Sequence, residues 1–226
     1  ALAELMTVGN RARTADWYRL HAEVLIQQDK HNDALTTVET GLKTAPGSRA
    51  LRIAKVRALL AAGKKTQAAD LANRLYRNNS QNVDVLLAAG VVLSATNKLA
   101  RAEARFKAAL GLDRGNPDVH SAFGKLLARK GKWDRAAFHL KRAASSQPSA
   151  AKRWLAHGDL LYHQGRMDAA KSQLKTALSK SPDHPAALIH LARLHVATGK
   201  FQAAEKLLKK VEKKQRTQRW NLIYGW

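Results

Sequence analysis

Residues 151–184 read AKRWLAHGDLLYHQGRMDAAKSQLKTALSKSPDH, and residues 117–150 follow the same pattern of apolar, small and polar positions. Alanine marks this 34-residue period along most of the chain, at Ala34, Ala68, Ala102, Ala136, Ala170 and Ala204. A unit of this length is too short to bury a core alone, so its copies must pack against their neighbours. The period therefore predicts a solenoid whose function lies on a surface.

In this register the chain divides into six repeats without gaps, at residues 15–48, 49–82, 83–116, 117–150, 151–184 and 185–218. Each repeat contains two stretches with apolar or small residues at helical spacing, as at Leu155 and Leu161, then at Leu174 and Leu178. Each repeat is thus expected to form two helices. We expect residues 1–14 to end a preceding repeat and residues 219–226 to begin a following helix, so that the chain is a fragment of a longer array.

A turn-forming residue separates the two predicted helices of every repeat. The column contains Asp29, Gly63, Asn97, Gly131, Gly165 and Gly199. Glycine and asparagine tolerate the left-handed backbone conformation that ends a helix tightly. The column therefore predicts where each first helix stops.

This pattern is similar to the tetratricopeptide repeat family, whose unit is a 34-residue helix–turn–helix. The family's small first-helix position is filled here by Ala22, Gly90, Gly124, Gly158 and Ala192, and its aromatic position by Tyr18 and Trp154. The second repeat departs from the pattern at Arg52, Lys55 and Val56. The resemblance implies an all-α fold, a right-handed superhelical solenoid of antiparallel helix pairs. It also implies a non-catalytic scaffold that binds other proteins.

Positive charge is the second informative feature, because the net charge is +23. The first repeat has a net charge of −2, whereas the following five carry +7, +2, +5, +3 and +6. A basic residue follows the turn in each repeat, and we call five of these the basic rim: Lys64, Lys98, Lys132, Arg166 and Lys200. The rim is interpreted either as a surface that steers an acidic partner or as an ordinary solvated outer face.

In the tetratricopeptide fold the first helices line a concave groove, so polar residues on those helices are candidate contacts with a partner. The candidates are Arg19, Glu23, Arg57, Lys125, Arg129, Asp159, His163, His190 and Arg193. Basic side chains beside small apolar residues could hold an extended or helical acidic peptide by charge-assisted hydrogen bonds. The alternative is a groove that is merely hydrated.

The sequence predicts no catalytic, cofactor or metal site, so we expect the chain not to be an enzyme. Cysteine is absent, which excludes disulfides and thiolate ligands. The nine histidines are scattered over several repeat positions, and His190 and His195 are five residues apart, a spacing that does not align two ligands on one helical face. No apolar run approaches the roughly 20 residues of a membrane-spanning helix, and no signal-peptide pattern opens the chain.

Two alternatives to a protein partner follow from the charge. One is direct binding of an anionic polysaccharide, and the other is binding of RNA by the basic surface. Nucleic acid is the weaker prediction because the aromatic residues Trp133, Phe138, Trp154 and Phe201 are interpreted as core residues, which leaves none for stacking on bases.

Long arrays of this family occur in bacterial exopolysaccharide exporters, where they lie in the periplasm and recruit polymer-modifying enzymes. The absence of cysteine and the Ala- and Leu-rich composition agree with such a cell-envelope setting. The partner predicted there is an acidic protein, as in the assemblies that make a biofilm matrix.

Overall fold

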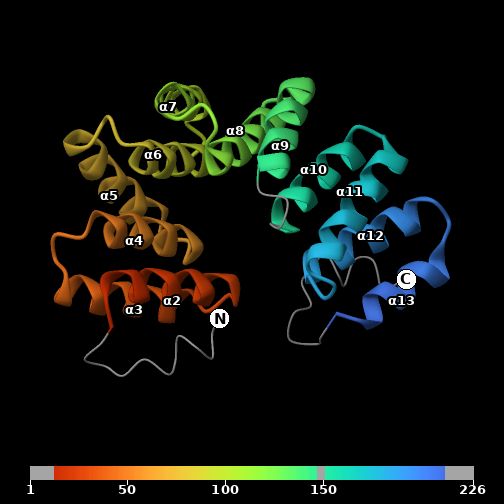
Figure 1. Ribbon diagram of the computed structural model, residues 1–226, viewed down its shortest axis with the longest axis horizontal. Helices are drawn as coiled ribbons and strands as arrows, with labels where there is room; N and C mark the ends of the chain where they lie inside the picture. Colours follow the sequence, from red (N-terminus) through yellow and green to blue (C-terminus); the bar gives the residue numbers. More distant parts are fainter. Residues whose placement is uncertain (1–12, 147–150, 212–226) are drawn as a thin grey trace. The chain divides into compact units, whose positions relative to one another are not determined.

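The computed structural model describes residues 13–146 and 151–211, and this part of the chain forms twelve α-helices and no strand (Figure 1). The first helices of the repeats are α2 (Ala15–Gln27), α4 (Arg49–Ala61), α6 (Val83–Ala95), α8 (Pro117–Arg129), α10 (Ala151–His163) and α12 (Pro185–Ala197). The second helices are α3 (His31–Thr44), α5 (Lys65–Asn78), α7 (Leu99–Leu112), α9 (Trp133–Ser146), α11 (Met167–Lys180) and α13 (Phe201–Lys209). The all-α fold predicted from the sequence is confirmed.

The helices form two compact units that divide between Arg114 and Gly115. In unit 1, α2 packs on α3, α4 on α5 and α6 on α7, and the first helices α2, α4 and α6 also contact one another in succession. Unit 2 repeats this scheme with α8 to α13. In each unit the first helices therefore form one continuous face, which we call the first-helix face. Residues 1–12 and 212–226, on which the expectations for the chain ends fall, lie outside the described residues.

Each first helix ends where the turn column predicts. Asp29 and Asn97 have φ of 60° and 62°, and the four glycines of the column have φ between 70° and 74°. The next residue donates its backbone N–H to the last turn of the helix, as Lys64 does to the Leu59 carbonyl at 2.8 Å. This hydrogen bond satisfies a carbonyl that the helix leaves unpaired. The second helix begins directly afterwards.

The first helices of unit 1 begin at side-chain caps that occupy one repeat position. Thr14, Ser48 and Asn82 accept the backbone N–H groups of Trp17, Leu51 and Val85 at 3.1–3.3 Å. Each such cap satisfies one of the free amides of the first turn and contributes about 1 kcal/mol.

Small residues on the first helices make room for large residues on the second helices. A Cβ added to Gly90 would lie 2.5 Å from the Phe106 ring, and one added to Gly124 would lie 2.7 Å from Cγ of Leu140. Real Cβ atoms do not approach so closely, so a larger residue at either position would force the facing side chain to move. The large partner is always sixteen residues after the glycine.

The second repeat reverses this arrangement, which explains its departure from the family pattern. Val56 stands at the small position, and sixteen residues later the large position holds Ala72, with both side chains buried. The polar departures are paired, because Lys55 Nζ lies 2.8 Å from Glu39 on α3 and Arg52 donates to the Pro46 carbonyl at 2.7 Å.

The interpretation of the aromatic residues as core residues is wrong for three of the four. Trp133, Phe138 and Phe201 are 43%, 58% and 66% exposed, whereas Trp154 is partly buried. Trp133 and Phe201 are the first residues of α9 and α13, where the hairpin turn leaves them outside the packed stripe. Phe138 lies on the side of α9 opposite its buried residues.

Candidate functional site

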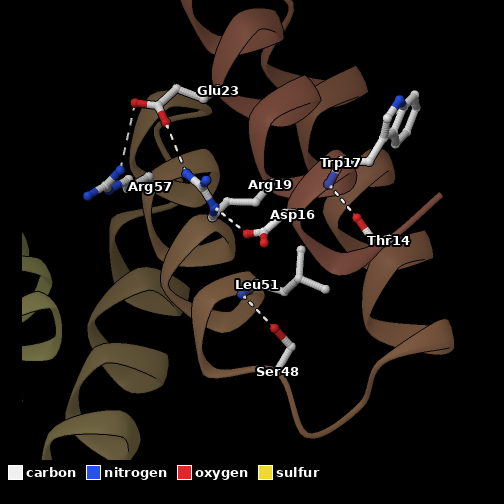
Figure 2. A network of polar contacts seen from close by, with 8 residues as sticks. All are labelled: Thr14, Asp16, Trp17, Arg19, Glu23, Ser48, Leu51 and Arg57. Atoms are coloured by element: carbon white, nitrogen blue, oxygen red, sulfur yellow. Dashed lines mark hydrogen bonds and ion pairs between the residues drawn. The ribbon is translucent and has the colours of Figure 1, made fainter. Parts of the chain in front are cut away.

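On the first-helix face of unit 1, an exposed network of charges joins α2 to α4 (Figure 2). Arg19 lies between two carboxylates of its own helix, 3.3 Å from Asp16 and 3.9 Å from Glu23. Arg57 on α4 lies 3.7 Å from the other oxygen of Glu23. The side chains of Arg57 and Glu23 are 44% and 38% exposed, so water screens this pair and keeps it weak.

On the first-helix face of unit 2, Asp159 on α10 contacts two residues of α12, Arg193 and His190. Arg193 Nη2 and His190 Nδ1 lie 2.6 Å and 2.7 Å from the same Asp159 oxygen. His163 lies 3.8 Å from that oxygen. The Arg193 guanidinium also stacks on the Tyr162 ring, 4.2 Å from its centroid. Because His190 and Arg193 are mostly buried, this network is better shielded from water than the one in unit 1.

The charge of Asp159 is strongly favoured in the folded protein. Burial by itself raises the pKa of this carboxyl, but the hydrogen bond and charge of His190, with the charges of Arg193 and His163, outweigh it. Together these groups lower the pKa of Asp159 from 3.8 to about 2. The carboxylate is therefore ionised at every physiological pH and holds α10 to α12.

The Glu23–Arg57 pair of unit 1 and the Asp159–Arg193 pair of unit 2 are formed by residues at the same repeat position. This column, one residue per repeat, contains Glu23, Arg57, Val91, Lys125, Asp159 and Arg193. Because successive first helices pack side by side, residues 34 apart become neighbours, and an acid followed by arginine one repeat later forms a bridge. A similar link joins α10 to α8, where the buried Arg153 lies 3.1 Å from Asp118.

Lys125 and Arg129 are the remaining candidates, and both are exposed on α8. They are four residues apart, so they follow one face of the helix. The structure thus brings Glu23 and Asp159 into contact with arginine or histidine side chains, and Arg57, Lys125 and Arg129 are exposed.

All five residues of the basic rim are exposed at the hairpin turns. Their backbone N–H groups close the preceding helix, a role that any residue except proline can fill. Four of them, at Lys64, Lys98, Arg166 and Lys200, directly precede the second helix and make no side-chain cap. The backbone therefore does not explain why these residues are basic.

Within residues 13–146 and 151–211 there is no group of three histidine, cysteine, aspartate or glutamate side chains that could hold a metal ion. In the same ranges, none of the helices combines the length and the apolar character that crossing a bilayer requires.

Models of one protein family match nearly the whole chain. Their description is tetratricopeptide repeat, and they match residues 19–83, 53–117, 86–160 and 161–224. No curated protein sequence matches the chain.

Several solved structures share the fold at low sequence identity. A chain in the APC/C hetero-tetramer Cut9–Hcn1 is 18% identical over 92% of this chain and 40% of that one, with a TM-score of 0.81. The tetratricopeptide protein TTC0263 of Thermus thermophilus is 20% identical over 81% of this chain and 100% of that one, with a TM-score of 0.72. Human IFIT1, solved as a dimer with PPP-AAAA, is 18% identical over 88% and 50%, with a TM-score of 0.72. This chain thus spans less than half of the matched Cut9–Hcn1 chain, and these likenesses establish the fold alone.

Proposed function

Because the chain belongs to the tetratricopeptide repeat family, whose repeats suggest a protein–protein interaction scaffold, we propose that it recruits an acidic protein partner through its first-helix face. The scaffold is non-catalytic in this proposal. The binding elements are the exposed cations of that face, and the basic rim steers the partner towards it.

The exposure of Arg57, Lys125 and Arg129 carries this proposal. Arg57 is only loosely held by Glu23, at 3.7 Å, so a carboxylate of a partner can replace that contact at little cost. Lys125 and Arg129 present two cations in succession on α8. Within unit 2, a partner segment with carboxylates along an extended or helical stretch would match the Lys125–Arg129 pair by charge-assisted hydrogen bonds.

The other polar candidates have a supporting role in this proposal. Asp159, His190 and Arg193 fix α12 against α10 through short contacts, and breaking them to reach a partner would expose a buried pair. We therefore propose that Asp159, His190 and Arg193 keep this face rigid and do not contact the partner directly. His163 is the last residue of α10 and lies at the end of that face.

A cell-envelope setting is the specific variant of this proposal. The partner would then be an enzyme that modifies an exopolysaccharide, and the array would dock it in the periplasm. The absence of cysteine and the Ala- and Leu-rich composition support this variant.

The test compares two double charge reversals in the full chain. Arg57→Glu with Lys125→Glu alters the first-helix face, and Arg101→Glu with Lys175→Glu makes the same change of charge on exposed second-helix residues. The probes are a fluorescent glutamate-rich peptide, alginate and oligo(U), each titrated at several salt concentrations. We expect the first variant to bind the peptide at least about tenfold more weakly and the control to bind within about twofold of wild type.

Equal loss in both variants would show a nonspecific charge effect and contradict the proposal. Binding of alginate or oligo(U) that is tighter than peptide binding, and that weakens steeply with salt, would favour the anionic-polymer alternative instead.

A further inference from the structure

The outer face of α9 combines an exposed aromatic ring with a cluster of cations. Phe138 is 58% exposed, and Arg135, Lys141 and Arg142 are exposed three or four residues away on the same side of the helix. Asp134 is the single acidic residue among them. We call these five residues the α9 outer face. They lie away from the buried stripe of α9, which packs on α8 and α10.

Phe138 is unusual among the residues at its position in the repeat. The other repeats carry Thr36, Asp70, Ala104, Ser172 and Lys206 there. The fold therefore does not need an aromatic residue at this place. What distinguishes Phe138 from the other exposed aromatic residues is its setting, because its ring lies among three exposed cations on one side of α9 and so offers an apolar contact beside charges that an acidic segment can pair with.

The charge of this face is constant around neutral pH. His139 touches the Phe138 ring edge-on, with the ring centroids 5.3 Å apart. Burial, reinforced by the charges of His120, Arg135 and Arg142, lowers the pKa of His139 to about 4. His139 is therefore neutral, and the positive charge comes from Arg135, Lys141 and Arg142.

We propose that the α9 outer face binds an acidic polypeptide segment, which places an apolar side chain on Phe138 and carboxylates on Arg135, Lys141 and Arg142. Aromatic residues and arginine are enriched at protein interfaces, and the α9 outer face combines Phe138 with Arg135 and Arg142. This site lies on a second helix and does not depend on binding at the first-helix face.

The position of the aromatic residues favours a polypeptide over a polymer that follows the array. A single-stranded nucleic acid or a polysaccharide would meet equivalent positions in successive repeats and would use a repeated aromatic platform. Here the next repeats offer Ser172 and Lys206 instead. Trp133 is five residues from Phe138 and so points in a different direction from the helix axis, which prevents the two rings from forming one stack.

The experiment uses the full chain and two fluorescent peptides that contain the same number of glutamates, one with leucine and one with alanine at the centre. Binding is followed by anisotropy at physiological salt for wild type, Phe138→Ser and Phe201→Ser. Serine is the residue that the following repeat has at the Phe138 position, so the fold should tolerate it. Phe201 is the matched control because it is similarly exposed in the same unit but lies on α13.

We expect Phe138→Ser to weaken binding of the leucine peptide about tenfold and to change binding of the alanine peptide by less than about twofold. The control variant Phe201→Ser should change the binding of neither peptide. Reversing Arg135 and Arg142 to glutamate should weaken both peptides. Equal binding of the leucine peptide to wild type and Phe138→Ser would overturn the proposal. So would equal losses in both phenylalanine variants, or an oligo(U) affinity that depends on Phe138 more than the leucine peptide does.

Discussion

Units 1 and 2 place an acid and an arginine at the same repeat position, yet the two bridges differ in kind. Glu23 and Arg57 are 3.7 Å apart and solvated, whereas Asp159 and Arg193 are 2.6 Å apart and shielded. The neighbours explain the difference, because Ala54 and Ile26 of unit 1 stand where unit 2 has His190 and Tyr162. A repeat position therefore determines which residues meet, and the surrounding side chains determine how strongly they interact.

The packing between the two helices of a repeat shows the same relation when two repeats are compared. Gly124 of unit 2 accommodates Leu140, and Val56 of unit 1 accompanies Ala72. What matters at this crossing is the combined volume of the two residues and not the identity of either. Four predictions test the comparison of the units, from the largest expected effect to the smallest.

The largest effect is expected from overfilling the helix crossing of unit 2. Gly124→Val puts branched carbon atoms where a single Cβ already lies 2.7 Å from Leu140 and 3.2 Å from the Ala136 carbonyl. We expect the free energy of unfolding to fall by about 3 kcal/mol, measured by urea denaturation. The double variant Gly124→Val with Leu140→Ala reproduces the combination of the second repeat, Val56 with Ala72, and should recover most of the loss. If Leu140→Ala restores none of the lost stability, then the combined volume of the two residues does not govern this crossing.

The second prediction concerns the two charge networks. Asp159→Asn keeps the shape of the side chain but leaves Arg193 and His190 without their carboxylate, so stability should fall by about 2 kcal/mol. The matched change in unit 1, Glu23→Gln, removes only solvated contacts and should cost less than about 0.5 kcal/mol. Both are measured by urea denaturation at neutral pH. Equal losses of stability in Asp159→Asn and Glu23→Gln would show that the two charge networks do not differ in strength.

The third prediction is the pH dependence that Asp159 gives to unit 2. Its pKa is lowered by folding, so its contribution to stability is complete above the unfolded value of 3.8 and is lost as the pH falls through about 2. The contribution at neutral pH amounts to about 2 kcal/mol. Nuclear magnetic resonance titration of the carboxyl group should give a pKa near 2, and the stability difference between wild type and Asp159→Asn should shrink below pH 4. A carboxyl group that titrates near 3.8 would contradict the network.

The smallest effect is expected from the ring beneath Arg193. Tyr162→Leu removes the aromatic face 4.2 Å from the guanidinium and should cost about 0.5–1 kcal/mol, while Tyr162→Phe keeps the ring and should be nearly neutral. A double-mutant cycle with Arg193→Met isolates this interaction from the packing of the ring. A coupling energy of zero would show that Arg193 is held by Asp159 alone.

Much of the fold was predictable because its signals are local and repeated. The turn column fixed the first-helix ends, since the required left-handed conformation suits few residue types. The position before each first helix of unit 1 carries a further signal, the caps Thr14, Ser48 and Asn82, which could also have marked the helix starts. The column that contains Glu23, Arg57, Asp159 and Arg193 is a further signal, which could have indicated that these side chains meet across neighbouring first helices.

The environment of single residues was less predictable. Phe138 departs from the general expectation that an aromatic residue is buried, because its angular position on α9 places it on the exposed side of the helix. The signal that could have revealed this exposure is its repeat position, which holds a polar residue or alanine in all five of the other repeats. His190 was predicted as a polar contact of the face, and the structure buries it beside Asp159.

The sequence by itself determined the period, the helix pairs, their ends and the positive charge, because these depend on residue types at fixed spacing along the chain. Only the tertiary structure decided which of the equivalent charges are shielded and which aromatic rings remain in water. Those properties depend on the distance and bulk of side chains from neighbouring helices, and repeat spacing does not specify either.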